Sequence, residues 1–428
     1  MIEIDKITNI VGNHVPPYLY GKNFIAGETY VPYAGPYWDN EEAIAAINTF
    51  LNGDWITAGD SVHSFEKEFA RKFHAKYALM VNSGSSANLV MIGALKKYFR
   101  WENGDEIIVS PVAFPTTISV IVQNRLVPVF VDIEWDTLNF DLQCIKDKIN
   151  DRTRAVFLSP VLGNPPDMDD LTQLCERADI KLIADNCDSL GSKWDGKYLT
   201  EYCVAQSNSF YPAHHISTGE GGMICTDDAK LMKIMVSMAW WGRDCVCVGK
   251  DNLLKDGSCG ARFGKWLEFY DGIVDHKYVF SNMGYNLKPL DLQGAIGLVQ
   301  LKKFDDIEYR RKRSKMIITS LIVDRIKGVQ GVKKYDKADV CWFGTPFICE
   351  SKELKMALVK HFEDNKIQTR NYFSGNILFH PGYFDLDNYW EYPNAMKVLD
   401  KVFFLGAAPH YEDKVFDYVN EVVKYFKF

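Results

Sequence analysis

The sequence has few of the features that mark a membrane or nucleic-acid-binding protein. It has no continuous apolar run close to the roughly 20 residues that a transmembrane helix requires. It has no basic stripe, and 56 acidic residues outnumber 49 basic ones, so the net charge is −7. We therefore expect neither a membrane nor a nucleic acid as a partner.

Repeats, low-complexity segments and a signal peptide are also missing. The N-terminal residues MIEIDKITNIVGNH include acidic side chains and no long apolar stretch, which predicts a cytoplasmic protein. In that compartment we expect the ten cysteines to form no disulfide bonds. A chain of 428 residues with 47% hydrophobic and 25% charged residues has an ordinary globular composition. It is too long for one simple core and should form two or three domains.

Short apolar segments alternate with helical patterns through the first 300 residues. Helices are expected at 40–51, 64–73 and 86–98, where Phe65, Phe69 and Phe73 share one helical face. Strands are expected at 77–81, 106–110, 127–133, 155–160, 181–185 and 205–210. Because these strands are almost entirely apolar, we expect a mostly parallel sheet that is covered by helices on both faces.

The pattern changes near residue 301, where a long amphipathic helix is expected over 301–326. A smaller mixed segment follows and ends in the helical sequence VFDYVNEVVKYFKF. We therefore predict two domains. Residues 1–300 form an N-terminal segment and a large α/β domain, and residues 301–428 form a small C-terminal α+β domain.

The residues that follow each strand are informative, because open parallel sheets bind ligands beyond the carboxyl ends of their strands. The strand at 77–81 is followed by NSGSSAN, residues Asn82–Asn88. This turn opens a helix, and its backbone N–H groups and hydroxyls suit a phosphate. An ordinary strand–helix connection capped by serine explains the same residues equally well.

Three further strands end in side chains that suit a pyridoxal-type cofactor. Phe114 follows the second strand and can stack on a planar ring, or simply fill the core. Asp185 ends the strand at 181–185. A buried carboxylate there needs a partner, such as a protonated pyridine nitrogen, unless it caps a helix. Ser209 ends the strand at 205–209. Each signal is weak alone, but their order along the chain is the order that such a site requires.

The loop SFYPAHHISTGEGG, Ser209–Gly222, resembles a loop that binds pyridoxal phosphate through a lysine, yet it contains no lysine. His214 and His215 lie in its middle. Without a lysine the cofactor cannot be attached to the protein as a Schiff base, so we expect noncovalent pyridoxamine phosphate. An ordinary loop histidine is the alternative interpretation of His214.

These segments resemble a known family over nearly the whole chain. NGDWITAG, NSGSSANL, FPTT, SNSFYPAHHISTGEGG and GYNLKPLDLQGAIGLVQL are similar to the sugar aminotransferase/dehydratase branch of the aspartate aminotransferase superfamily. The resemblance implies the α/β fold of PLP-dependent transferases, fold type I. Aminotransferases of the branch have their lysine at the position of His214, and histidine within YPAHH is typical of its 3-dehydratases. More narrowly, the chain resembles the iron–sulfur group, the CDP-4-dehydro-6-deoxyglucose 3-dehydratases.

The resemblance implies an enzyme that removes the C3 hydroxyl of a nucleotide-linked 4-keto-6-deoxy sugar in deoxysugar biosynthesis, with pyridoxamine phosphate as cofactor. His214 would be the base that takes a proton from the cofactor's methylene carbon, which histidine can do near neutral pH. The implied cofactor contacts are Gly84, Ser85 and Ser209 at the phosphate, Phe114 on the ring, Asp185 at the ring nitrogen with Asp188 nearby, and Asn286 at the phosphate of a neighbouring subunit. The last contact implies a homodimer at least.

The ten cysteines divide into two sets. Six are scattered and are expected to be small core residues: Cys144, Cys175, Cys203, Cys225, Cys341 and Cys349. The other four are Cys187, Cys245, Cys247 and Cys259, separated by 57, one and eleven residues. Four thiolates suit zinc or an iron–sulfur cluster, although the spacing has no C-x2-C pairs of a zinc ribbon. A chance occurrence of the Cys245–Cys247 pair is the alternative.

The resemblance implies that these four cysteines bind a 2Fe–2S cluster. The chain departs from the family pattern in a last gap about four residues longer, and in Asn186 where a cysteine is usual. The elimination product needs two electrons. A cluster delivers them singly, which implies an NAD(P)H-dependent flavin/iron–sulfur reductase as partner.

Three other functions are compatible with parts of the sequence. A nucleotide-sugar aminotransferase would need the missing lysine. A cluster-independent dehydratase that recycles its cofactor with glutamate would not need the four cysteines. A noncatalytic zinc-binding regulator would not need the phosphate, acid and base residues. Arg370 and the pair Asp275–His276 are further candidates for contacts with substrate.

Overall fold

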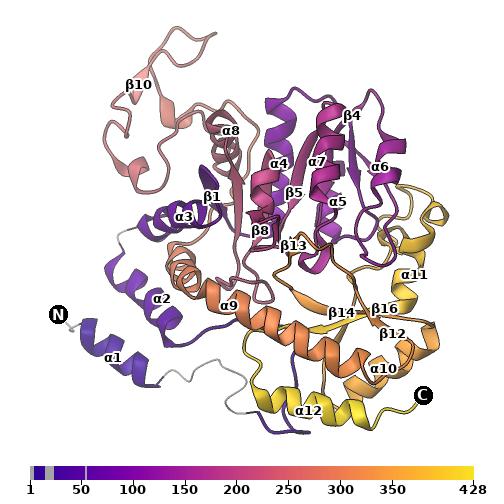
Figure 1. Cartoon of the computed structure of the whole chain (residues 1–428). Helices are drawn as coiled ribbons and strands as arrows, with labels where there is room; N and C mark the ends of the chain where they lie inside the picture. The colour runs from indigo at the N-terminus through magenta and orange to yellow at the C-terminus, as the bar shows by residue number, and fades with distance from the viewer. Residues whose placement is uncertain (1–3, 15–23, 54) are drawn as a thin grey trace.

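The computed structural model describes residues 4–14, 24–53 and 55–428 (Figure 1). Asp54 of the NGDWITAG segment lies outside this part of the chain. The large domain is built on a seven-stranded sheet. Its strands, in spatial order, are β1 (Tyr77–Val81), β9 (Gly222–Thr226), β8 (Ala205–Ser209), β5 (Lys181–Asp185), β4 (Thr153–Leu158), β2 (Glu106–Val109) and β3 (Val127–Phe130).

This sheet is mostly parallel, as the apolar strands predicted. β8, β5, β4, β2 and β3 run parallel to one another, and β9 alone pairs antiparallel, with both β1 and β8. The carboxyl ends of β1, β2, β5 and β8 therefore meet at one edge. The polar residues that follow these strands are brought to a common place by the topology.

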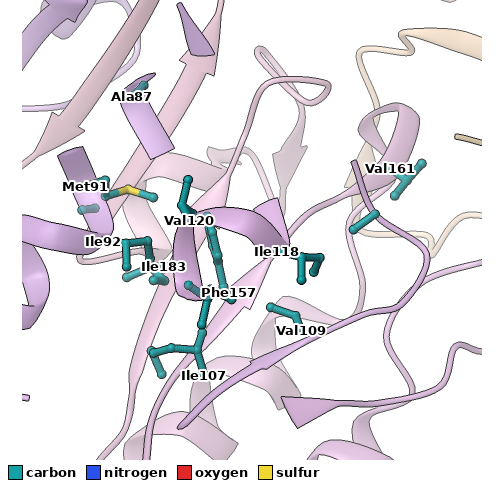
Figure 2. Close-up of a cluster of buried hydrophobic side chains, with 14 of the residues drawn as sticks. Ala87, Met91, Ile92, Ile107, Val109, Ile118, Val120, Phe157, Val161 and Ile183 are labelled. Atoms are coloured by element: carbon teal, nitrogen blue, oxygen red, sulfur yellow. The ribbon is translucent and has the colours of Figure 1, made fainter. Parts of the chain in front are cut away.

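Helices cover both faces of the sheet because alternate strand residues point to opposite sides. Ile107, Phe157 and Ile183 face one side, and Ile108, Val156 and Leu182 face the other. The first side packs against α4 (Gly84–Tyr98), α5 (Pro115–Gln123) and α8 (Ala229–Ala239). Figure 2 shows part of this cluster, with Met91 and Ile92 of α4 beside Ile183 and Phe157. The second side packs against α6 (Leu142–Lys148) and α7 (Met168–Arg177).

The C-terminal part forms a four-stranded antiparallel sheet. Its strands are β12 (Val329–Gly331), β14 (Gly344–Cys349), β16 (Val402–Gly406) and β15 (Thr369–Asn371), and its helices are α10 (Lys352–Asp364), α11 (Pro393–Lys401) and α12 (Asp413–Lys424). Phe24 and Val31, from the start of the chain, belong to its hydrophobic core. Val31 also forms a parallel bridge with Ile367.

A single helix, α9 (Asp291–Val323), connects the two sheets (Figure 1). It begins ten residues earlier than expected, directly after the segment that contains Pro289. The predicted division between residues 300 and 301 therefore falls inside a continuous helix, and it stays a prediction. The N-terminal side of α9 packs on α2 (Asn40–Asn52) and α3 (Asp60–Lys72).

The predicted aromatic stripe of α3 is buried against α9 and the loop after β8. Phe65, Phe69 and Phe73 are at most 1% exposed, and Phe304 of α9 and Phe210 complete their cluster. Phe73 itself stands at the C-cap, one residue beyond the helix.

The remaining strands are short. β6 (Lys193–Trp194), β7 (Lys197–Tyr198) and β13 (Ala338–Asp339) form a small sheet, and β10 (Phe263–Gly264) pairs with β11 (Val274–Asp275) in a hairpin that extends from the body (Figure 1). The other helix is α1 (Ile4–His14). Across the described ranges, no helix is both long enough and apolar enough to cross a bilayer.

The close packing of α3 on α9 leads to a first prediction. A Cβ atom on Gly294 would lie 2.4 Å from the backbone nitrogen of Val62, so Gly294→Ala forces the helices apart. That overpacking costs more than the roughly 1 kcal/mol that alanine gains in a helix. We expect the free energy of unfolding, measured by denaturant titration, to fall by about 1–2 kcal/mol.

The control for this measurement is Gly382→Ala, because a Cβ atom there has no heavy atom within 4 Å. We expect its effect to stay within about 0.5 kcal/mol. A Gly294→Ala protein more stable than the native one would show that the helices are not in contact at this residue.

Candidate active site

A cavity of about 620 Å³ lies at the edge of the large sheet where the strands carry their polar residues. It is lined by eight of the predicted site residues, Gly84, Ser85, Phe114, Asp185, Cys187, Asp188, Ser209 and His214. Residues of the C-terminal part close its other side, among them Arg370, Phe373 and Phe404. The site therefore lies between the two sheets.

The N-terminus of α4 forms one end of the cavity. Ser83 caps the helix and accepts a hydrogen bond from the Ser86 backbone N–H at 3.1 Å. Gly84 lies against β8, and a Cβ atom there would be 2.5 Å from the Cβ of Ser209. A Cβ on Gly222 would likewise lie 2.3 Å from the Ser83 carbonyl oxygen. Glycine at these two positions lets the helix start reach the strand ends, where its N–H groups suit a phosphate.

Asp185 lies at the bottom of the cavity, at the end of β5, and is only 6% exposed. Its Oδ2 accepts hydrogen bonds from Nδ2 of Asn88 and from Oγ1 of Thr117, both at 2.7 Å. Its Oδ1 accepts a hydrogen bond from the Cys187 backbone N–H at 3.3 Å. The hydrogen-bond partners are all neutral, so a buried cation is the partner that this carboxylate lacks. A protonated pyridine ring meets that requirement.

Phe114 forms a side of the cavity. It occupies the N-cap position of α5 and is half exposed, unlike the apolar residues around it. Its ring lies 6.0 Å from that of Phe373. An exposed aromatic face beside Asp185 suits the stacking of a planar ring, so the arrangement of these residues fits a pyridoxal-type cofactor.

His214 lines the same cavity from the loop between β8 and β9. Its side chain is 15% exposed, and its Nδ1 is 3.6 Å from Oδ1 of Asp188. That distance is too long for a hydrogen bond, and within the described chain the buried Nδ1 has no hydrogen-bond partner. Burial, aided by the charge of Arg311, lowers the pKa of His214 to about 3. The imidazole is therefore neutral at pH 7 and able to accept a proton.

Asp188 and His214 are close enough to be counted as an ion pair, but their pKa values argue against one. Burial and the neighbouring Asp185 carboxylate raise the pKa of Asp188 to about 8. Both partners therefore favour their neutral forms at pH 7. The contact is better described as a neutral acid beside a neutral base.

The loop that carries His214 is fixed by contacts on both sides. His215 points away from the cavity, and its Nε2 lies 2.8 Å from the Cys341 carbonyl oxygen. The Trp38 indole N–H donates to the Ser217 carbonyl at 3.1 Å. The ring of Phe343, which precedes β14, lies 5.3 Å from the His214 ring.

The four cysteines predicted to bind a cluster are not assembled in one place. Cys187 lines the cofactor cavity, where a Cβ on Gly84 would be 3.0 Å from its sulfur. Cys245 and Cys247 are buried side by side, with the Cys247 N–H 3.4 Å from Sγ of Cys245, and Cys259 is exposed. Within the described ranges, no group of three or more Cys, His, Asp or Glu side chains is arranged to hold a metal ion.

The local environment of Cys247 nevertheless favours a thiolate. Burial opposes ionisation, but hydrogen bonds to the sulfur outweigh it and lower the pKa of Cys247. The largest come from the hydroxyl and backbone N–H of Ser258, both at 3.1 Å, and the Cys259 backbone and the Cys245 thiol add to them. Burial raises the pKa of the neighbouring Cys245. The six cysteines outside this set are free thiols, four of them buried and two half-buried.

Asn286 and the pair Asp275–His276 are not among the residues that line the cavity. Asn286 is exposed and accepts a hydrogen bond from Lys288. Asp275 pairs with Arg262, and His276 contacts Asp244 at 2.7 Å. Arg370, by contrast, lines the cavity, and its guanidinium lies 4.0 Å from the centre of the Tyr33 ring.

Some residues of the site were not predicted. Asn88 and Thr117 hold Asp185 in place, and each is buried near the start of a helix. Asn88 belongs to the segment NSGSSAN and Thr117 to the segment FPTT. One signal could have identified both residues: a polar side chain near the start of a helix, on the face that packs against the sheet. Tyr33, Phe343 and Phe404 line the cavity from distant parts of the chain, and no local pattern marks them.

Comparison with known proteins gives a consistent result. The model of the DegT/DnrJ/EryC1/StrS aminotransferase family matches residues 38–424. The chain is 38% identical to a dTDP-4-dehydro-2,6-dideoxy-D-glucose 3-dehydratase of Saccharopolyspora spinosa, over 94% of this chain and 88% of that protein. It is 33% identical to the lipopolysaccharide biosynthesis protein RfbH of Salmonella typhimurium, over 97% and 96%.

Solved structures of related enzymes have the same fold. A GDP-4-keto-6-deoxy-D-mannose-3-dehydratase of E. coli with bound hydrated PLP superposes with a TM-score of 0.80, at 30% identity, over 92% of this chain and 99% of that one. This confirms the predicted fold type I. A GDP-4-keto-6-deoxymannose-3-dehydratase with a trapped PLP-glutamate geminal diamine matches with a TM-score of 0.79 and 29% identity, over 93% and 100%.

The buried, neutral His214 makes the stability of the protein without cofactor sensitive to acid. Its pKa is lower in the folded than in the unfolded chain, so its contribution is complete above the unfolded value of about 6.5 and is lost as the pH falls towards 3. Between pH 7 and pH 5 the free energy of unfolding of the native protein should fall by about 2 kcal/mol more than that of His214→Asn. Urea titrations at the two pH values measure this difference, and equal losses would show that His214 is not desolvated.

Proposed function

This chain belongs to the DegT/DnrJ/EryC1/StrS aminotransferase family, and we propose that it is a pyridoxamine-phosphate-dependent 3-dehydratase. Its substrate would be a nucleotide-linked 4-keto-6-deoxy sugar. The observation that carries the proposal is His214, a neutral imidazole in a cofactor-sized cavity. Among the described residues that line this cavity, none is a lysine, so the attachment used by aminotransferases has no residue to form it.

Pyridoxamine phosphate supplies an amine that condenses with the sugar ketone, and a ring that accepts the electrons released when a proton is removed. The N–H groups at the start of α4, with Ser85 and Ser209, would bind its phosphate. Phe114 would stack on the ring. Asp185 would keep the ring nitrogen protonated, because its buried carboxylate is held by neutral donors and would gain a cationic partner.

His214 would take the proton from the methylene carbon of the cofactor and pass a proton to the departing C3 hydroxyl. Its lowered pKa keeps the imidazole free to accept the proton at pH 7. Asp188 lies 3.6 Å from Nδ1 of His214, and its raised pKa favours a neutral carboxyl beside the imidazole. Elimination then moves a proton and a hydroxyl, and no net electrons.

The side of the cavity formed by Tyr33 and the C-terminal residues suits the nucleotide. Tyr33, Phe373 and Phe404 offer aromatic surface, and Arg370 adds a positive charge beside Tyr33. Aromatic rings with one guanidinium are the groups that a base and a diphosphate need. The similar 3-dehydratases are named for dTDP- and GDP-linked sugars, which agrees with this interpretation.

The test compares His214→Asn with His215→Asn, since both histidines lie on the same loop and only His214 lines the cavity, whereas His215 is buried outside it. A panel of CDP-, dTDP- and GDP-linked 4-keto-6-deoxy sugars is incubated with pyridoxamine phosphate in oxygen-18 water. We expect His215→Asn to incorporate the label at C3 and His214→Asn to be slower by at least about 100-fold. Equal labelling by the two variants would rule out His214 as the base.

We further propose that Cys187, Cys245, Cys247 and Cys259 bind a 2Fe–2S cluster, through which an NAD(P)H-dependent flavin/iron–sulfur reductase would deliver two electrons one at a time. The lowered pKa of Cys247 supports this, because the thiolate is the ligand form. The arrangement of the thiols does not support it, because within the described ranges no three of them are placed to hold a metal ion together. The alternative is the cluster-independent route with glutamate, which the similar structure with PLP and glutamate favours.

The cysteine proposal predicts that a variant without the cluster keeps the elimination step and loses the reduction step. Cys245→Ser with Cys247→Ser should keep oxygen-18 exchange at C3, which needs no electrons, and lose 3-deoxy product formation with NADH and a flavin reductase. The matched control is Cys144→Ser with Cys203→Ser, at two half-buried thiols outside the set. Full deoxygenation by the first variant, supported by glutamate alone, would establish the alternative route.

We also propose a homodimer in which Asn286 of each subunit binds the cofactor phosphate of the other. Asn286 is exposed and outside its own cavity, and Phe280, Met283, Tyr285 and Leu290 expose apolar surface around it. An apolar surface of this kind is typical of an interface between subunits.

A further inference from the structure

Arg311 is the most deeply buried cation near the proposed active site, and nothing in the cofactor chemistry accounts for it. It lies near the middle of α9 and is only 1% exposed. Burial lowers the pKa of Arg311 to about 10, which still leaves it charged at pH 7. A buried charge is costly, so its contacts should show what it does.

Those contacts are backbone carbonyl oxygens from two segments far apart in the sequence. One terminal nitrogen, Nη2, donates to the carbonyls of Ala213 at 3.2 Å and His214 at 2.9 Å. The other, Nη1, donates to the carbonyl of Phe343 at 3.1 Å and reaches that of Trp342 at 3.5 Å. The guanidinium therefore joins the loop that carries His214 to the segment before β14.

The geometry points to Arg311 as the positioning residue for His214; this inference rests on the proposed function. Both sides of the His214 ring depend on it. Arg311 donates a hydrogen bond to the backbone carbonyl of His214. It also donates to the backbone carbonyl of Phe343, whose ring lies 5.3 Å from the imidazole. A planar fork with five donors can bind both segments at once.

Lysine cannot replace this arrangement. Its ammonium is a single point with three donors, so it can carry the charge but cannot reach carbonyls on both sides in fixed directions. With Arg311→Lys, the sequence of the loop that carries His214 is unchanged, but the hydrogen bonds that join this loop to the segment before β14 are lost. Reacting groups displaced by about 1 Å lose on the order of 100-fold in rate. The proposed phosphate and ring contacts come from the start of α4, from Phe114, from Asp185 and from Ser209 within β8, and these stay in place.

The experiment reads the position of residue 214 without using the dehydration reaction. In the parent variant His214→Lys, the new amine can form a Schiff base with added pyridoxal 5'-phosphate. The rate at which its visible absorbance appears reports how well the side chain is aimed. Borohydride reduction and mass spectrometry confirm attachment at residue 214. This readout remains valid even if the chain proves not to be a dehydratase.

Two double variants are compared with that parent. Adding Arg311→Lys should slow Schiff-base formation by about 100-fold, while noncovalent affinity for pyridoxamine 5'-phosphate, measured by equilibrium dialysis, stays at the parental value. Adding Arg313→Lys is the matched control, since Arg313 lies on the same helix, is 31% exposed and pairs with Asp413. It should leave both quantities unchanged.

Three results would overturn the inference. The first is an unchanged rate with Arg311→Lys. The second is an equal loss of rate and of pyridoxamine 5'-phosphate affinity, which would show general damage rather than misplacement of one residue. If Arg311→Lys does not fold, Arg311→Gln is measured instead, with the same expected result. Failure of both to fold while Arg313→Lys folds would make Arg311 a folding requirement only.

Discussion

The buried carboxylate of Asp185 is the constraint on which the arrangement of the candidate site depends. It ends β5 in the middle of the sheet, and it is held by Asn88 of α4 and Thr117 of α5. Two helices on the same face are thereby tied to one strand. The start of α4, which suits a phosphate, and Phe114, which precedes α5, are fixed relative to the carboxylate by the same two hydrogen bonds. Loss of either donor would leave the buried carboxylate with one hydrogen bond fewer.

The sheet and its polar edge could be predicted because they depend on local patterns. Apolar strands followed by NSGSSAN, FPTT, Asp185 and Ser209 converge wherever a parallel sheet forms, since the carboxyl ends of its strands share one edge. His214 was marked by the absence of lysine in an otherwise familiar loop. The predicted start of α9 is ten residues too late, because the segment after Pro289 was interpreted as a family motif and not as a helix.

The remainder depends on tertiary contacts that no local pattern records. Arg311 lies in a helix with many charged residues, and nothing in RRKRSK distinguishes the one that is buried from those that are exposed. Cys187 was grouped with three distant cysteines on spacing and resemblance, yet it lines the cofactor cavity. Tyr33 enters the same cavity because its segment packs on the C-terminal sheet, 335 residues away in sequence.

The contact between the Tyr33 segment and the C-terminal sheet affects when the cavity can form during synthesis of the protein. The backbone N–H of Tyr33 donates to Gln368, and Val31 pairs with Ile367, so one wall of the cavity joins the two ends of the chain. Contacts of such long sequence separation form late, and domains near the N-terminus fold first as the chain leaves the ribosome. The sheet with Asp185 can fold while synthesis continues, but the cavity cannot close until nearly all of the polypeptide has emerged.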